Sequence, residues 1–345
     1  MHNSVTDEAD SGRGPYLVGV VLLFAAGVLW SLNGALIKLV FEDGRGPHAV
    51  TIAFYRSLFA GLFLLPLARG KLHTLANVKR SKSKHVQTSR HGELKTERKT
   101  ESLETATVNS PVLTFRLFDF LTFLRPAAVC CVVFFTLMTI CFVLAVTKTE
   151  AANAIILQYT STFWIFALSP LILGEKPHLR DLWLLGIAMI GIGIIFAGKA
   201  DTDLAGLLIA LCAGLCFGLE TMMIRLMRNS DSAAVIVLNC LGSAVLLLPA
   251  ALFVGHLMVT PKAWALLVLL GIVQFGIPYY LYARALVHVP AYVAALITLT
   301  EPILVPVWTY LAVKEKVPAT TIIGGGVILL ALILFVRTAR HRIVE

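Results

Sequence analysis

The sequence predicts an all-α, polytopic membrane protein whose ten transmembrane helices form two inverted five-helix repeats. Three observations predict this fold. First, the 345 residues are 58% hydrophobic and only 14% charged, and the mean hydropathy of +0.83 exceeds that of soluble domains. Second, ten apolar stretches reach the roughly 20 residues that a helix needs to cross a bilayer. Third, the second half of the chain resembles the first.

The apolar stretches define the predicted helices in order. Residues 1–15 are polar and acid-leaning, unlike a cleaved secretory leader, so we predict a disordered cytoplasmic N-terminus and a retained first helix. Residues 338–345 are predicted to be a cytoplasmic tail. The ten predicted spans are residues 16–40, 48–68, 126–147, 150–173, 179–198, 204–227, 233–255, 261–286, 290–313 and 318–337.

An internal repeat relates the two halves. The stretch "WSLNGALIK" at Trp30–Lys38 aligns with "FGLETMMIR" at Phe217–Arg225 at a shift of 187 residues. The second and seventh spans match at a shift of 183, and the next three pairs at 140, so about 43 extra residues entered the first half. Because each half has an odd number of spans, the halves are inverted, as in many secondary transporters. The predicted repeats cover residues 16–198 and 204–337.

The extra residues form a basic loop at 69–125. It holds 12 of the 29 Lys and Arg residues, and its polar part shows no apolar period, which predicts a disordered linker. Residues 112–124 are apolar and suit an interfacial helix. We expect membrane lipids as its partner and no nucleic acid, since no aromatic residues are interleaved. The positive-inside rule, with 21 basic residues against seven, then places both termini in the cytoplasm and the protein in the cell membrane.

Polar side chains inside the predicted spans indicate a cavity, because an ionised group at the bilayer centre costs about 2.5–3.5 kcal/mol. Trp30 and Asn33 are three residues apart and share a helix face. Trp164 would add an aromatic wall. The predicted substrate-binding residues are Trp30, Asn33, Gln158, Tyr159, Glu220, Tyr279 and Glu301.

Structural roles are open for several of these residues. We predict that Arg56 is a structural charge partner, paired with Glu220 or Glu301, because a buried charge without a counter-ion is costly. Glu301 precedes Pro302, whose missing amide leaves a helix carbonyl free, so the glutamate equally suits a local helix break.

Neutral and terminal residues carry similar alternatives. Asn33 suits an interhelical hydrogen bond as well as a substrate contact, and Trp30 suits packing as well as a ligand wall. Lys38 and Arg225, at equivalent helix ends, are expected to extend to the membrane interface. Glu175 and Glu315 are expected to accept hydrogen bonds from the first amides of the helix that follows each of them.

Small residues mark close helix contacts. Two stripes of small residues are expected to face each other across the pseudo-two-fold axis. Other glycines suit packing within one chain or in a homodimer. The stripes are Gly206, Ala210, Gly214 and Gly218 in the sixth span, and Gly19, Gly27 and Ser31 in the first.

The order of several motifs resembles the EamA family of the drug/metabolite transporter superfamily. The motifs are the "WSLN" at residues 30–33 with Lys38, Tyr55-Arg56, the run "YLYARALVHVPAYVAAL" at 280–296, Glu301-Pro302 and the Glu-Lys pairs at 175–176 and 315–316. The resemblance implies two five-helix bundles around a central cavity and transport of small metabolites, often outward. Thr162 stands where the second half has Pro302, so any hinge there is expected to be asymmetric.

The sequence therefore predicts a secondary transporter, most probably an exporter of amino acids or related small molecules, working by alternating access. A membrane-embedded enzyme acting on lipid-linked substrates and a passive channel are the alternatives. Against the enzyme, the sequence has no His-rich cluster, paired-Asp tract or activated nucleophile. All six cysteines fall inside predicted spans without metal-site spacing. We expect no catalytic residues, no metal and no cofactor.

Overall fold

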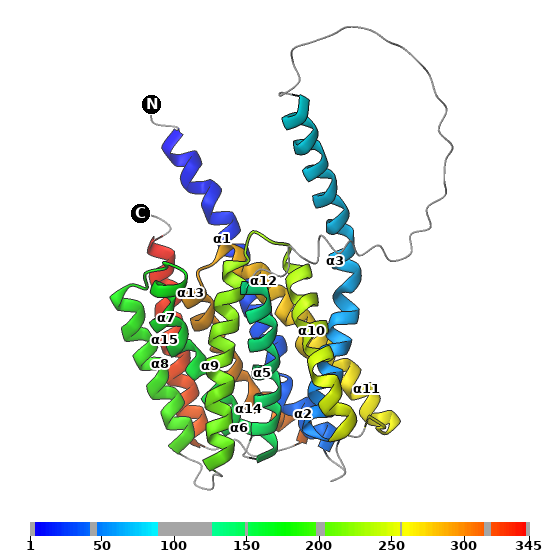
Figure 1. The fold of residues 1–345 in the computed structure, drawn as a ribbon. Helices are drawn as coiled ribbons and strands as arrows, with labels where there is room; N and C mark the ends of the chain where they lie inside the picture. The colour runs from blue at the N-terminus through cyan, green and yellow to red at the C-terminus, as the bar shows by residue number, and fades with distance from the viewer. Residues whose placement is uncertain are drawn as a thin grey trace, which may run out of the picture.

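The structure, a computed structural model, describes residues 4–41, 47–88, 126–148, 151–197, 204–255, 257–313 and 319–342. Every regular element in these ranges is a helix (Figure 1). Seven helical segments of this part are long and apolar enough to span a membrane. Leu171, Trp183 and Phe253 point outward with 82%, 70% and 89% exposure, as suits contact with lipid. The chain is an integral, polytopic membrane protein.

Six predicted spans contain one continuous helix each. They run close to the predicted boundaries, with one large difference. The third helix continues about five turns into the predicted loop, because extending a formed helix adds a hydrogen bond for each residue without a new nucleus. These helices are α3 (Ala49–Thr88), α5 (Pro126–Lys148), α8 (Leu179–Ala197), α9 (Leu204–Leu226), α10 (Ser232–Phe253) and α15 (Ala319–Arg342).

The other four predicted spans are interrupted. Three consist of two helices, and the fourth contains a π-helix, η1, in its middle. π-Helices are rare and often occur at functional sites. The pairs are α1 (Ser4–Trp30) with α2 (Asn33–Phe41), α6 (Ala151–Gln158) with α7 (Thr160–Ile172), and α13 (Ala291–Ile297) with α14 (Thr300–Val313); the fourth span is α11 (Pro261–Leu269), η1 (Leu270–Gly276) and α12 (Ile277–His288).

Two predictions at the chain's ends and in its loop change accordingly. α1 begins at Ser4, so the stretch predicted to be disordered is mostly helical. The start of α1, the end of α15 and the projecting end of α3 lie at the same end of the bundle (Figure 1). Residues 89–125, with the interfacial helix predicted at 112–124, lie outside the described residues.

Side chains satisfy the backbone at the α1–α2 break. The hydroxyl of Ser31 donates to the carbonyl of Val28 at 2.6 Å and accepts from the indole of Trp308 at 2.7 Å. The amide of Gln274, from η1, donates to the carbonyl of Trp30 at 3.4 Å. Irregular backbone at membrane depth needs such partners, since lipid offers none.

The other two breaks lie at equivalent places in the repeat. The α6–α7 break is at Tyr159, and the α13–α14 break at Thr298 and Leu299, which is 140 residues later. The expected asymmetric hinge is therefore wrong, because the first half is interrupted without a proline. Thr160 and Thr300 each donate to the carbonyl three residues earlier, at 2.6 and 3.1 Å.

The glycine stripes face these breaks. A Cβ on Gly214 would lie 2.5 Å from the hydroxyl of Thr160 and 2.8 Å from the carbonyl of Leu157, while one on Gly27 would strike the hydroxyl of Thr300. The prediction that the two stripes face each other is wrong. A small-residue stripe shows that a neighbour approaches closely but does not identify that neighbour.

Four helix pairs make the most extensive contacts: α1 with α12, α3 with α10, α5 with α9, and α8 with α15. In the order of the predicted spans these are one with eight, two with seven, three with six, and five with ten. Exchanging the two halves leaves this set of pairs unchanged.

Candidate functional site

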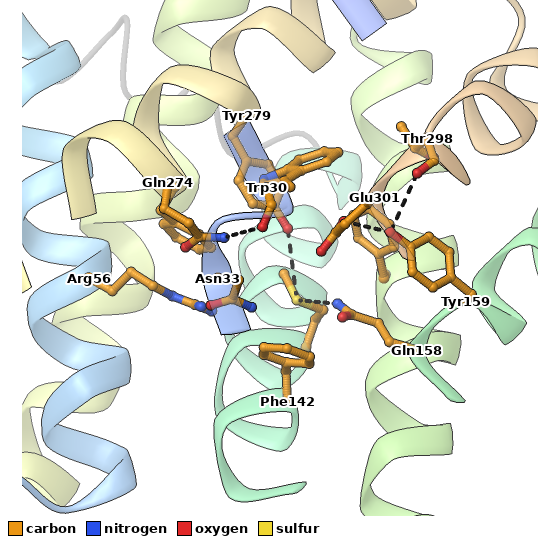
Figure 2. Close-up of a pocket in the computed structure, with 13 residues that line it drawn as sticks. Trp30, Asn33, Arg56, Phe142, Gln158, Tyr159, Gln274, Tyr279, Thr298 and Glu301 are labelled. Carbon is orange, nitrogen blue, oxygen red and sulfur yellow. Dashed lines mark hydrogen bonds between the residues drawn. The ribbon is translucent and has the colours of Figure 1, made fainter. Parts of the chain in front are cut away.

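The interrupted helices converge on a cavity of about 30 Å³ in the middle of the bundle (Figure 2). Its wall mixes aromatic, amide and charged side chains. A volume of this size holds about one water molecule, whereas pockets for small molecules typically measure about 300–1,000 Å³. The lining residues are Trp30, Asn33, Arg56, Met138, Phe142, Gln158, Tyr159, Phe217, Gln274, Phe275, Tyr279, Thr298 and Glu301.

The cavity brings together six of the seven residues predicted to bind substrate. They come from segments far apart in the chain, and their contact with a substrate stays a prediction. Trp164, expected as an aromatic wall, is not among the lining residues. The six are Trp30, Asn33, Gln158, Tyr159, Tyr279 and Glu301.

Glu301 is held at the α13–α14 break. Its carboxylate accepts a 2.6 Å hydrogen bond from the hydroxyl of Tyr159 at the α6–α7 break. The same hydroxyl lies 3.4 Å from the carbonyl of Thr298, which is the carbonyl that the missing amide of Pro302 leaves free. Glu301 thus serves the local helix break, and it also presents a carboxylate to the cavity.

Arg56 is oriented by aromatic rings. Its guanidinium lies 4.2 Å from the ring centroid of Phe275 and 5.9 Å from that of Phe142, within cation–π range. Among the described residues it forms no ion pair, so the predicted pairing with Glu220 or Glu301 is not found. The side chain is 2% exposed and lines the cavity, which leaves a cationic group available there.

Three amide side chains complete the polar wall. The amide nitrogen of Gln158 lies 3.6 Å from the sulfur of Met138. The side-chain oxygens of Asn33 and Gln274 have no hydrogen-bond partner in the part of the chain described. Gln274 was missed by the sequence analysis, because its repeat counterpart is Phe134 and its helix reads as plain apolar. A single polar residue within an apolar span was the signal that pointed to it.

Aromatic rings cover one side of the cavity. The Trp30 ring packs on Tyr279 and Tyr282 with centroids 5.0 and 5.1 Å apart, and on Phe217 at 5.9 Å. The hydroxyl of Tyr282 lies 3.0 Å from that of Thr221. Trp30 therefore packs within the bundle and forms part of the cavity wall, so both predicted roles apply.

Glu220 is the predicted site residue that does not line the cavity. It is fully buried, and within the described structure neither carboxylate oxygen has a hydrogen-bond partner. Its position in α9 is one turn after Phe217, which does line the cavity. The prediction that Glu220 contacts substrate from this wall is therefore not supported by its placement.

A buried ion pair joins four helices at one end of the bundle. The Nε of Arg225, at the end of α9, donates to Glu175 at 2.7 Å, and Glu175 also accepts from the amide of Ala291 at 2.9 Å. Arg225 donates further to the carbonyls of Leu286 and Val287. Arg225 is 8% exposed and does not extend to the interface as predicted.

Glu175 also differs from its predicted role. It caps the start of α13 instead of the helix that follows it, and Asp181 accepts from the amide of His178 before α8. Lys38 and Glu315, the repeat counterparts of Arg225 and Glu175, lie where side chains are not described.

Comparisons with known proteins agree with this architecture. The model of the EamA-like transporter family matches residues 106–197 and 204–337. A solved crystal structure with 15% identity superposes with a TM-score of 0.68 over 94% of this chain and 98% of that chain, which shows a shared fold.

Three relatives are similar over about half of this chain. An uncharacterized transporter of Archaeoglobus fulgidus is 26% identical over 189 residues, 54% of this chain and 68% of the relative. The uncharacterized transporter YwfM of Bacillus subtilis is 26% identical over 178 residues, 50% of this chain and 59% of the relative. The pseudopaline exporter CntI of Pseudomonas aeruginosa is 27% identical over 210 residues, 59% of this chain and 72% of the relative.

Proposed function

Because the chain belongs to the EamA-like transporter family, we propose that it is a secondary transporter exporting small zwitterionic metabolites, amino acids or related compounds, by alternating access. One observation carries the choice of cargo. The cavity presents the unpaired guanidinium of Arg56 and the carboxylate of Glu301, with amide groups between them. Arg56 suits the carboxylate of the cargo and Glu301 its ammonium group.

The size of the cavity adds a requirement. At about 30 Å³ it cannot hold an amino acid, so the helices that line it must separate to admit cargo. The three broken helices provide places where such movement needs no loss of regular helix hydrogen bonds. Discontinuous helices around a midplane site are common in secondary transporters. The similarity to an exporter of pseudopaline supports outward transport.

The arrangement of ten spans in two inverted halves is part of this proposal. Two equivalent contacts support it: Gly27 meets Thr300, and Gly214 meets Thr160. The second pair follows from the first when the repeat shifts of 187 and 140 residues are applied. The exchange symmetry of the main helix pairs supports the same arrangement.

We place both termini in the cytoplasm and the protein in the cell membrane. The positive-inside rule supports this orientation. The start of α1, the end of α15 and the basic extension of α3 share one end of the bundle (Figure 1), as a common cytoplasmic side requires. The Glu175–Arg225 pair lies at the end of the bundle that this orientation makes cytoplasmic.

A thermal-shift screen of the detergent-purified protein tests the proposed cargo. Amino acids, polyamines, nucleobases and sugar nucleotides are compared, because a ligand that binds only the folded state raises its stability. We expect amino acids or related zwitterions to stabilise the protein. Arg56→Gln should abolish that shift, while the matched control Arg284→Gln, an exposed arginine near the ring of Tyr280, should keep it. Stabilisation by polyamines that persists in Arg56→Gln would contradict the assignment.

A further inference from the structure

The interface between α9 and α10 contains a second polar site, separate from the cavity. Glu220 and Asn239 are both 0% exposed. Both oxygens of the Glu220 carboxylate and the amide oxygen of Asn239 lack a hydrogen-bond partner among the residues described. Buried polar atoms are nearly always paired, so three unpaired acceptors in one region require an explanation.

The repeat relates this site to the cargo cavity. Glu220 is the counterpart of Asn33, and Asn239 is the counterpart of Arg56. Asn33 and Arg56 line the cavity, whereas their counterparts are sealed away from it. The same two helix positions therefore carry different chemistry in each half: a guanidinium and an amide at the cavity, and a carboxylate and an amide in the sealed site.

The surroundings of Glu220 contain no cation. Asn239 donates its amide hydrogen to the sulfur of Cys131 at 3.2 Å, so its oxygen remains an acceptor. Arg56 is the cationic side chain closest in role, and Cys240 and Tyr279 interact electrostatically with both Arg56 and Glu220. The titratable groups that interact with Glu220 are Cys131 from α5, Cys216 from its own helix, Cys240 from α10, and Tyr279 and Tyr282 from α12.

We infer that Glu220 binds a proton that is exchanged during the transport cycle. A bare carboxylate without donors or a counter-ion is strongly disfavoured in an apolar interior, and a proton removes the charge. Sodium would need several oxygen ligands, but the neighbours of this carboxylate include two thiols. Intramembrane acidic residues commonly serve proton relays in transporters.

The position of Glu220 couples it to the cavity. Phe217, one turn earlier on the same face of α9, lines the cavity, and so does Tyr279, which interacts with Glu220. Trp30 packs on both rings. Widening the cavity for cargo displaces this aromatic layer and gives Glu220 access to water. Cargo entry and proton exchange thus share one movement; this inference rests on the proposed transport function.

Infrared spectroscopy tests the proton itself and needs no cargo. The spectrum of the wild-type protein minus that of Glu220→Gln should contain the carbonyl stretch of a protonated carboxylic acid near neutral pH. Glu220→Asp keeps a carboxyl group, and should shift this band without removing it. Carboxylate bands in the difference spectrum would overturn the proposal. If Glu220→Gln does not fold, the Asp variant decides alone, and an acid band that does not shift overturns the proposal.

Reconstituted vesicles test the coupling. The probe is the amino acid that stabilises the protein most in the thermal-shift screen. An imposed pH gradient should drive its accumulation by the wild type but not by Glu220→Gln, while exchange of labelled for unlabelled amino acid continues in both. Proton-driven accumulation by Glu220→Gln, or a requirement for a sodium gradient, would overturn the proposal. If no amino acid binds, the proposed cargo fails, whereas the infrared result still decides the protonation of Glu220.

Discussion

Replacing Gly214 with alanine tests how closely α9 approaches the α6–α7 break. The new Cβ would lie 2.8 Å from the carbonyl of Leu157 and 3.0 Å from that of Gln158. Both neighbours are backbone atoms, which cannot rotate away. Overpacking of this kind costs about 1–3 kcal/mol, whereas alanine in place of glycine at an unobstructed helix position gains about 0.5–1 kcal/mol.

Gly193→Ala is the matched control, since a Cβ at that position of α8 meets nothing within 4 Å. The difference between the two variants isolates the contact, and should equal about 1–3 kcal/mol. Thermal unfolding followed by tryptophan fluorescence measures it. At about 2–4 °C per kcal/mol for domains of 150–250 residues, Gly214→Ala should melt a few degrees below Gly193→Ala. Equal melting temperatures would refute the close approach.

Three further variants test single contacts by thermal unfolding or ligand binding. Glu175→Gln keeps the shape but removes the charge that Arg225 pairs with, so stability should fall by about 1.5–3 kcal/mol; no change would mean the pair is not formed. Arg56→Lys keeps the charge but loses the flat contact with Phe275, so the ligand-induced shift should weaken, and an undiminished shift would contradict this. Asp231→Ala removes the N-cap of α10, which should cost about 1 kcal/mol and leave ligand binding unchanged.

The sequence predicted the membrane spans well because crossing hydrocarbon requires a long apolar run, and that requirement is visible residue by residue. It did not predict the helix breaks. The breaks at Ser31, Tyr159 and Thr298 lie inside apolar runs without glycine–proline signals at two of the three places. They depend on partners from other helices, such as Trp308 and the hydroxyl of Tyr159.

The candidate cavity was predicted in composition but not in every position. Polar residues in apolar spans gave six of its lining residues, because their burial cost implies a shared polar space. The same argument placed Glu220 in the cavity, since sequence shows that a residue must be buried but not on which side of a helix its space lies. Arg225 was assigned to the interface because its distant partner, Glu175, is visible only in the fold.

Access to the cavity from both sides of the membrane tests alternating access most directly. Gln158, which lines the cavity, is replaced by cysteine in a protein whose six native cysteines have been removed. A membrane-impermeant maleimide is then applied to oriented vesicles from one side or the other. The account predicts that Gln158→Cys reacts from either side and that a bound zwitterion slows both reactions. Reaction from one side only, with or without ligand, would contradict transport by alternating access through this cavity.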